Sequence, residues 1–332
     1  MQHVSYRLKT VDVNGQTILL WMKRLLKWLL KNLVIKMFSK IKHYGELVMF
    51  SHTIFSLPFA IFAYLLATDG AIDIKVLLWA IVALFGARNG ANAWNRIADY
   101  HIDLANARTA DRHLQTKKVS LKEAWIITFV CYIIYIVAAS QISFICFVLS
   151  PIPIVFFTIY PYTKRFTIFC HVFLGFSCAM AILGAWIAAN GLFFSFDLAA
   201  GTFTFELIPV ILFSAILLWN AGFDTIYGTQ DYEHDVAHNI KSMAVGFGVK
   251  GALLIAKLLH LTMMLLMLSL ALFSPSLGII YIIGLLIASV VFVIEHNVVD
   301  TKNHLIMKLA SYKLNQVISL TICFFGILDI YL

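Results

Sequence analysis

Residues 75–103 read KVLLWAIVALFGARNGANAWNRIADYHID, and this stretch contains both features that decide the fold. Its first part, residues 75–94, is mainly apolar, with Arg88 as the only charge after Lys75. About 20 apolar residues are enough for a helix to cross the ~30 Å core of a bilayer. Acidic residues then gather where the apolar part ends. The stretch therefore predicts a membrane-spanning helix that leads into a polar, chemically active segment.

The composition extends this interpretation to the whole chain. The 332 residues are 61% hydrophobic and 13% charged, with a mean hydropathy of +0.88. Soluble domains carry about 25% charged residues, so lipid must cover much of the apolar surface. We therefore expect an all-α polytopic membrane protein, a bundle of about nine transmembrane helices. The expected spans are 46–67, 75–94, 122–140, 143–162, 167–190, 207–223, 251–273, 277–295 and 313–331.

The N-terminal region differs from the rest of the chain. Residues 22–43 read MKRLLKWLLKNLVIKMFSKIKH, with Lys and Arg recurring among large apolar side chains. This pattern is typical of an amphipathic helix on an anionic membrane surface, or else of a basic flank that only sets topology. We expect two parts, a basic region at 1–44 and the transmembrane domain at 45–332, and no cleavable signal peptide.

The basic residues also predict an orientation. Nine of the 25 Lys and Arg residues precede the first span, and nearly all others fall in the loops after even-numbered spans. In the loops on the opposite side of the membrane, after odd-numbered spans, we find only Lys75. This bias predicts a cytoplasmic N-terminus, with both acidic motifs facing the cytoplasm, in the inner membrane of a cell. It also explains the net charge of +8 without a nucleic-acid partner.

Acidic residues form two spaced sets. Asn95, Asp99 and Asp103 are separated by four residues each, and so are Asp231 and Asp235 in the second set. On a helix such residues share one face and repel one another. Carboxylates near a membrane are costly and favour a cationic partner. Mg²⁺ takes oxygen ligands and is commonly shared between carboxylates and substrate phosphates. We therefore expect Mg²⁺ at these residues.

The two sets share a pattern and a side. Residues 99–103 and 231–235 both read D-Y-x-x-D, and both follow even-numbered spans. The match indicates an internal parallel repeat. Two other interpretations exist for the carboxylates. One is a solvated, salt-bridged loop, and the other is the cation or proton pathway of a transporter, a different class of protein.

The quoted residues resemble a known family. N-x-x-x-D-x-x-x-D at 95–103 with N-A-R-T-A-D-R at 106–112 is similar to the first motif of UbiA-type intramembrane prenyltransferases. D-x-x-Y-x-x-x-D-x-x-x-D at 224–235, followed by Lys241, is similar to their second. The resemblance runs from about residue 45 to the end and includes Y-P-Y-T-K-R at 160–165. After Arg112 this chain has His-Leu where many members have Pro.

The resemblance implies an activity and roles for particular residues. It implies transfer of a polyprenyl group from its diphosphate to an aromatic acid in quinone biosynthesis. The favoured acceptor is 4-hydroxybenzoate, and a 1,4-dihydroxynaphthoate-type acid is the alternative. The implied metal ligands are Asn95, Asp99, Asp103, Asp231 and Asp235. The implied diphosphate-binding residues are Lys164, Arg165, Arg108, Arg112 and Lys241. The implied catalytic residues are Asp224, Tyr227 and Tyr160.

Two residues inside the spans are candidates for binding the acceptor. Arg88 would pair with the acceptor carboxylate or with a motif acid, and His52 would contact the acceptor or merely join two helices. Another membrane enzyme class, the CDP-alcohol phosphotransferases, is disfavoured because the D-G-x-x-A-R element of that family is absent from the sequence.

Overall fold

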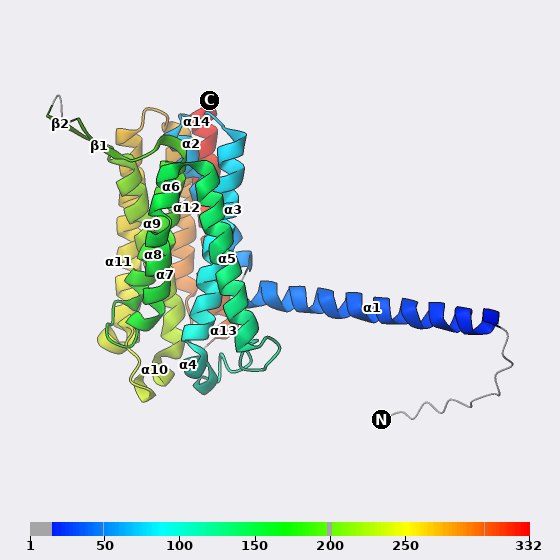
Figure 1. Ribbon diagram of the computed structural model, residues 1–332. Helices are drawn as coiled ribbons and strands as arrows, with labels where there is room; N and C mark the ends of the chain where they lie inside the picture. Colours follow the sequence, from blue (N-terminus) through cyan, green and yellow to red (C-terminus); the bar gives the residue numbers. More distant parts are fainter. Residues whose placement is uncertain (1–14, 49, 198–200, 302) are drawn as a thin grey trace. The chain divides into compact units, whose positions relative to one another are not determined.

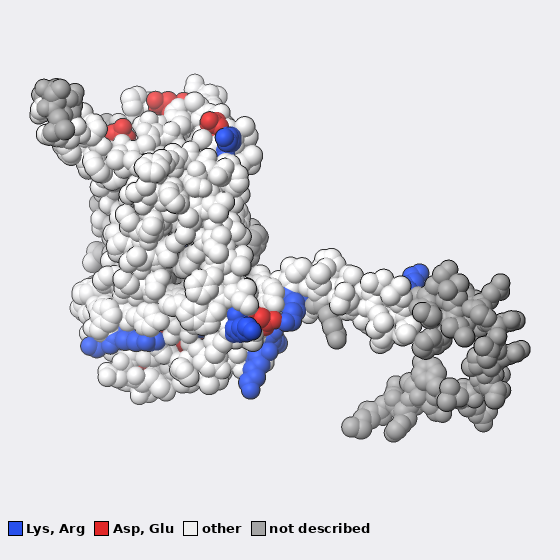
Figure 2. Space-filling view, in the orientation of Figure 1, with Lys and Arg blue, Asp and Glu red and all other residues white. Residues whose placement is uncertain are grey.

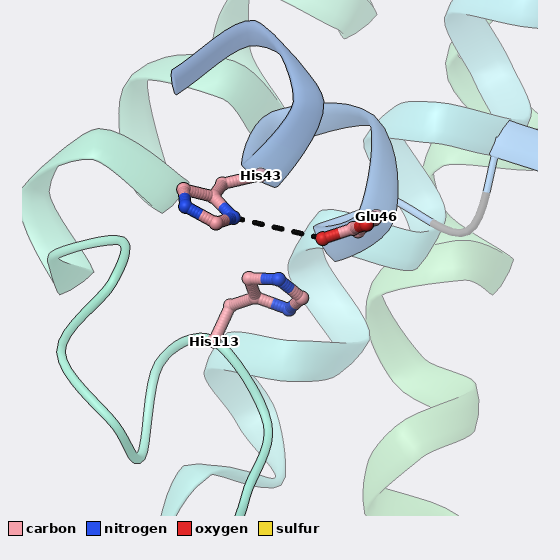
Figure 3. A group of neighbouring side chains, drawn as sticks. All are labelled: His43, Glu46 and His113. Carbon is pink, nitrogen blue, oxygen red and sulfur yellow. Dashed lines mark ion pairs between the residues drawn. The ribbon is translucent and has the colours of Figure 1, made fainter. Parts of the chain in front are cut away.

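The computed structural model describes residues 15–48, 50–197, 201–301 and 303–332. Within these ranges it describes all side chains except those of residues 15–23, 36, 50–55, 197, 304 and 308. The chain forms two compact units, Met1–Glu46 and Leu47–Leu332. Most of helix α1 (Gly15–Leu47) belongs to the first unit and covers the basic segment at 22–43. Near its end, His43 Nδ1 lies 3.6 Å from Glu46 Oε2 (Figure 3). The binding of α1 to a membrane surface stays a prediction.

The second unit is a bundle of long helices (Figure 1). These are α2 (Phe50–Ala67), α3 (Ile74–Ala98), α5 (Leu121–Ile142), α7 (Pro151–Thr163), α8 (Cys170–Asn190), α9 (Ile208–Gly228), α11 (Met243–Phe273), α12 (Ile279–Val298) and α14 (Asn315–Tyr331). The shorter elements are α4 (Tyr100–Ala105), α6 (Phe144–Leu149), α10 (Tyr232–Ala237), α13 (His304–Lys308), the 3-10 turn η1 (Thr229–Asp231) and the π-helical turn η2 (Leu309–Leu314). Among the described residues, eight helical segments are long and apolar enough to cross a membrane, and Ser56–Ala67 adds a shorter apolar stretch. The predicted all-α, multi-pass membrane bundle is confirmed.

The structure departs from the expected spans at three places. The span expected at 143–162 is two helices, α6 and α7, divided at Ser150, because Pro151 and Pro153 lack the N–H groups that a continuous helix needs. Helix α11 begins before residue 251 but is interrupted at Gly248, whose φ is +71°. A hairpin of β1 (Phe194–Asp197) and β2 (Thr202–Phe205) follows α8 and was not expected.

Small residues bring the helices of the bundle close together. A Cβ atom on Gly86 of α3 would lie 2.8 Å from the Cys131 carbonyl oxygen of α5. A Cβ atom on Gly175 of α8 would lie 2.3 Å from the Leu217 carbonyl oxygen of α9. Without a hydrophobic driving force between helices in lipid, such close backbone packing is a main source of stability.

Helices α3 and α9 run in the same direction and end at the same end of the bundle, which we call the motif end (Figure 1). The short helices α4 and α10 follow them there. Lys and Arg side chains gather on the bundle surface at this end, whereas acidic side chains are more prominent at the opposite end (Figure 2). The fold thereby places both acidic motifs next to the basic loops.

Candidate active site

The two D-Y-x-x-D motifs have the same local structure. Asp99 ends α3 with φ −94° and ψ 5°, and Asp231 ends η1 with φ −93° and ψ 5°. A helix of six residues follows each of them, α4 and α10. The helical path of each motif is therefore interrupted at its first Asp, where the backbone leaves regular helical geometry. The shared backbone instead supports the internal repeat.

The motifs face each other across a polar cavity of about 200 Å³. The predicted residues that line it are Asn95, Asp99, Asp103, Arg108, Arg112, Tyr160, Lys164, Asp224, Tyr227, Asp231, Asp235 and Lys241. Three predicted residues lie elsewhere or are undescribed. Arg165 is exposed and donates to the Ala98 carbonyl at 2.8 Å. Arg88 lies deeper in the bundle, and the side chain of His52 is outside the described part of α2.

Asp99 is the most enclosed carboxylate of the first motif, only 5% exposed. Its Oδ2 atom lies 2.6 Å from Lys164 Nζ and accepts from Asn95 Nδ2 at 3.1 Å. Its Oδ1 atom is buried without a hydrogen-bond partner. Burial raises the pKa of Asp99 above its ordinary value, although the Lys164 ammonium acts in the opposite direction. A further cation at Oδ1 would therefore stabilise the ionised form.

Arg108 joins the loop of the first motif to the second motif. It donates to both carboxylate oxygens of Asp231, from Nε at 2.8 Å and from a terminal nitrogen at 2.5 Å. It also donates to the Tyr227 hydroxyl at 2.8 Å. Burial alone would lower the pKa of Arg108, but the bonds to Asp231 raise it above the ordinary value. Bidentate contacts of this kind are strong and fix geometry.

The other predicted cations have fewer contacts with carboxylates. Arg112 reaches Asp103 Oδ2 through one nitrogen at 2.5 Å. Lys241 lines the cavity and donates to the Phe166 carbonyl at 3.4 Å. Arg108, Arg112 and Lys164 thus pair with motif carboxylates, as the salt-bridged interpretation expects. These pairs also hold the cations at the cavity wall, where an anionic ligand would meet them.

Sequence reasoning missed two residues of the site. His171, at the start of α8, lies with Nδ1 2.7 Å from Asp224 Oδ2, and its Nε2 atom is buried without a hydrogen-bond partner. Asn106 donates to Asp231 Oδ1 at 2.8 Å. Asn106 belongs to the quoted N-A-R-T-A-D-R segment, so its role was readable there. No local pattern marks His171, because its partner is 53 residues away.

The donor set fits Mg²⁺. The cavity offers carboxylates from both motifs and an orphaned, buried oxygen on Asp99. Hard oxygen ligands of this kind suit Mg²⁺, which binds through a few carboxylates and substrate phosphates. Among the described residues, His234 also lines the cavity, but carboxylates outnumber such nitrogen donors. The arrangement therefore resembles a magnesium–phosphate site more than a zinc site.

A second cavity of about 260 Å³ lies further into the bundle and is almost wholly apolar. It begins about one turn beyond the polar cavity, since Phe157 and Cys178 line it while Tyr160 and Leu174 line the polar one. Arg88 also lines it and donates to Cys178 Sγ at 2.8 Å. The Nε atom of Arg88 is buried without a hydrogen-bond partner. A guanidinium in this setting has unused capacity for an anion.

Residues 56–312 match the family model described as the UbiA prenyltransferase family. This chain belongs to that family. A relative from Pseudomonas aeruginosa named 4-hydroxybenzoate octaprenyltransferase is 32% identical over 69% of this chain and 73% of the relative. The apo structure of a UbiA homolog from Aeropyrum pernix K1 has a TM-score of 0.73 at 30% identity and covers 84% of this chain and 98% of that chain.

A more distant UbiA homolog, from Archaeoglobus fulgidus and bound to GPP and Mg²⁺, has a TM-score of 0.59 at 17% identity. The match covers 87% of this chain and 100% of that chain. At this identity the likeness concerns the fold. Family membership makes this chain a membrane-embedded transferase of prenyl groups, and prenyl diphosphates are the substrates typical of the family. It also favours group transfer over the transport alternative.

Proposed function

We propose that this chain transfers a polyprenyl group from polyprenyl diphosphate to a ring carbon of 4-hydroxybenzoate. One observation carries the proposal: two acidic motifs and three paired cations line a polar cavity, and an apolar cavity with one arginine begins about one helical turn beyond it. The name of the Pseudomonas aeruginosa relative supports this acceptor. A 1,4-dihydroxynaphthoate-type acceptor carries the same carboxylate and is the alternative to test.

The polar cavity is suited to the diphosphate. We assign Asn95, Asp99, Asp103, Asp231 and Asp235 to holding Mg²⁺, with Asp99 Oδ1 as the best-placed oxygen. Bound Mg²⁺ would neutralise the negative charge that develops on the leaving diphosphate. Lys164, Arg108, Arg112 and Lys241 line the same space and would donate charged hydrogen bonds to the diphosphate oxygens. Arg165 is exposed, so it would act only on an outer oxygen.

The apolar cavity is suited to the rest of the substrates. Its lining includes Leu84, Ala181 and Gly184, side chains that favour a hydrocarbon tail over water. Arg88 gives this cavity a charge, and its partner is a thiol and not a carboxylate. We assign Arg88 to the carboxylate of the aromatic acid, which would leave the ring facing the polar cavity. His52 stays a candidate for the same role.

The bond changes follow from these positions. The bond between the prenyl carbon and the diphosphate oxygen breaks, and its electron pair leaves with the diphosphate. The aromatic faces of Tyr160 and Tyr227 line the cavity and would stabilise the allylic cation. A ring carbon next to the phenol oxygen then forms the new bond and loses its proton. Asp224, oriented by His171 Nδ1 at 2.7 Å, would accept that proton at its carboxylate.

We place the motif end of the bundle on the cytoplasmic side of a bacterial inner membrane. The concentration of Lys and Arg at that end supports this orientation.

The test is prenyl transfer in purified membranes with a labelled polyprenyl diphosphate. We expect a Mg²⁺-dependent product with 4-hydroxybenzoate, which is lost on chelation and restored by added Mg²⁺. A product with dihydroxynaphthoate alone would move the assignment to the alternative acceptor. No product with either acid, from protein that runs as a single folded species, would refute the quinone-precursor proposal.

A further inference from the structure

A second cluster of ionisable side chains lies where α11 and α12 meet. It consists of His260 on α11 and of Glu295 and His296 in the last turns of α12. Glu295 is 0% exposed and His260 is 2% exposed. None of the three lines either cavity described above. Charged and polar groups this deep in a membrane protein need a partner, and they mark functional sites.

The hydrogen bonds around His260 settle which of its ring nitrogens carries the proton. Its Nε2 atom lies 3.3 Å from the Trp219 carbonyl oxygen, which can only accept, so Nε2 is the donor. The Nδ1 atom of the neutral ring therefore presents a lone pair. That atom lies 3.0 Å from His296 Nε2 and 3.7 Å from Glu295 Oε2. Gly222 permits this position, because a Cβ there would lie 2.4 Å from the His260 ring.

One carboxylate oxygen of Glu295 accepts a hydrogen bond, and the other has no hydrogen-bond partner. Asn315 Nδ2 donates to its Oε1 atom at 2.6 Å, and Asn315 Oδ1 in turn accepts from Trp219 Nε1 at 2.6 Å. The Oε2 atom is buried without a hydrogen-bond partner and faces His260. A proton shared between the two imidazoles would leave this oxygen unsatisfied, which is costly in an apolar interior.

The three facing atoms, His260 Nδ1, His296 Nε2 and Glu295 Oε2, have the spacing of a metal site. All of them lie within 4.8 Å of one another. A tetrahedral zinc ion with bonds of about 2.0–2.1 Å keeps its ligand atoms about 3.3 Å apart. The two distances from His260 Nδ1, 3.0 Å to His296 and 3.7 Å to Glu295, bracket that value. Two histidines and one glutamate are also an established zinc ligand set, with a fourth position for water.

Neighbouring residues hydrogen-bond the proposed ligands, as zinc sites require. Metal-binding histidines usually donate their second ring N–H to a carbonyl or carboxylate, and metal-binding carboxylates are themselves hydrogen-bonded. The Trp219 carbonyl does this for His260, and Asn315 does it for Glu295. These contacts come from α9 and η2–α14, so the cluster joins four helical segments.

We propose that His260, Glu295 and His296 form a zinc site, separate from the magnesium-binding motifs. The ion would satisfy the buried carboxylate and fix α11 and α12 against α9, the helix that carries Asp224. Its primary effect is then on the stability of the bundle, since the three ligands lie outside the reaction cavity. The inference does not depend on the identity of the aromatic acceptor.

The test measures bound zinc on the full-length protein in detergent. After zinc is added and excess is removed by gel filtration, we expect about one ion per chain in the wild type, by elemental analysis. Glu295→Gln keeps an oxygen for Asn315 but loses the anionic ligand, and we expect at least about a tenfold loss of zinc affinity. Glu206→Gln is the matched control, because Glu206 is an exposed glutamate that also accepts a hydrogen bond, from Trp186 Nε1 at 2.8 Å, but lies outside the cluster. This variant should bind zinc like the wild type.

Two further readouts separate zinc binding from misfolding. Zinc should raise the thermal unfolding midpoint of the wild type and of Glu206→Gln, but not of Glu295→Gln. Should Glu295→Gln fail to fold, His296→Gln removes the least buried ligand and is expected to lose zinc in the same way. Wild-type protein without bound zinc after loading, or equal zinc content in wild type and a folded ligand variant, would overturn the proposal. Magnesium-dependent prenyl transfer, measured in parallel, reports on the other centre.

Discussion

The polar and the apolar cavity are neighbours in one bundle, but the charged side chains that line them have different partners. Three cations of the polar cavity are already paired with carboxylates, as in the bidentate contact of Arg108 with Asp231. The apolar cavity has one cation, Arg88, with a thiol as its partner. On the proposed assignment, much of the charge in the first cavity is balanced before substrate binds, whereas the charge in the second would be balanced by the carboxylate of the acceptor. Substitutions in the two cavities should therefore affect different kinetic constants.

The largest effect is expected at the carboxylates of the polar cavity. Asp99→Ala and Asp231→Ala should each lower kcat by about 10³-fold or more, since several kcal/mol of metal stabilisation is lost. Single-turnover transfer with saturating substrates measures this. Asp300→Ala, an exposed acid outside the motifs, is the control. Near-normal kcat in either motif variant would remove that motif from the metal site.

The next effect should distinguish Arg108 from Arg112, both of which line the polar cavity. Arg108→Lys loses a bidentate contact and should lower kcat/KM for the diphosphate about 10²-fold. The reason is that an ammonium group cannot donate two parallel hydrogen bonds to a carboxylate as a planar guanidinium does. Arg112→Lys loses one single contact and should cost only about tenfold. Steady-state kinetics at fixed acceptor gives both values. Equal losses would contradict the geometric distinction between them.

In the apolar cavity the effect should fall on the acceptor. Arg88→Met should raise KM for 4-hydroxybenzoate by about tenfold or more, the contribution of one charged hydrogen bond, and leave KM for the diphosphate nearly unchanged. Cys178→Ala removes the thiol partner and keeps the guanidinium, so its KM should stay within a few fold of the wild type. If Arg88→Met raised KM for both substrates equally, Arg88 would be a packing residue.

A smaller effect is expected in the pH dependence of the polar cavity. The pKa of Asp99 is already raised by burial and is held down by Lys164. In Lys164→Met the pKa of Asp99 should rise further, so the carboxylate becomes protonated at a higher pH and Mg²⁺ binding fails there. The Mg²⁺ concentration for half-maximal activity should then increase more between pH 8 and pH 6 in the variant, by about fivefold. Arg165→Met, beside it but exposed, should follow the wild-type curve.

The smallest effect probes the size of the apolar cavity. Gly184 lines it, and a Cβ there would meet nothing within 4 Å. Gly184→Leu should therefore fold normally and fill part of the space, raising KM a few fold for a long-chain diphosphate but not for a short one. A series of prenyl diphosphates of increasing length measures this. The same KM change at every length would place the tail elsewhere.

The sequence predicted the bundle and most of the polar lining for a physical reason. Long apolar stretches define helices, and the direction of each successive helix places residues such as Asp99 and Asp231 at one end. It did not predict which cation meets which carboxylate. That depends on the loop that carries Arg108, whose path is set by contacts such as Thr109 with the Asp103 carbonyl, at 2.9 Å.

Other features were missed because they depend on tertiary contacts or on short patterns. The His171–Asp224 contact and the cluster around His260 join residues far apart in the chain. The hairpin at 194–205 did have a signal, since polar and aromatic residues alternate on both sides of Gly201. An apolar search alone does not detect such alternation.

The shortness of α4 and α10 has a consequence for local stability. Six residues are too few to hold a helix in isolation. The pair of Arg112 with Asp103 ties α4 to the loop that follows it, and the pair of Arg108 with Asp231 ties that loop to the residue before α10. The backbone amides of α4 and α10 should therefore exchange with deuterium much sooner than those of the long helices. The rate of that exchange should rise with salt and fall when a phosphate-bearing ligand binds, so the two short helices would report occupancy of the site.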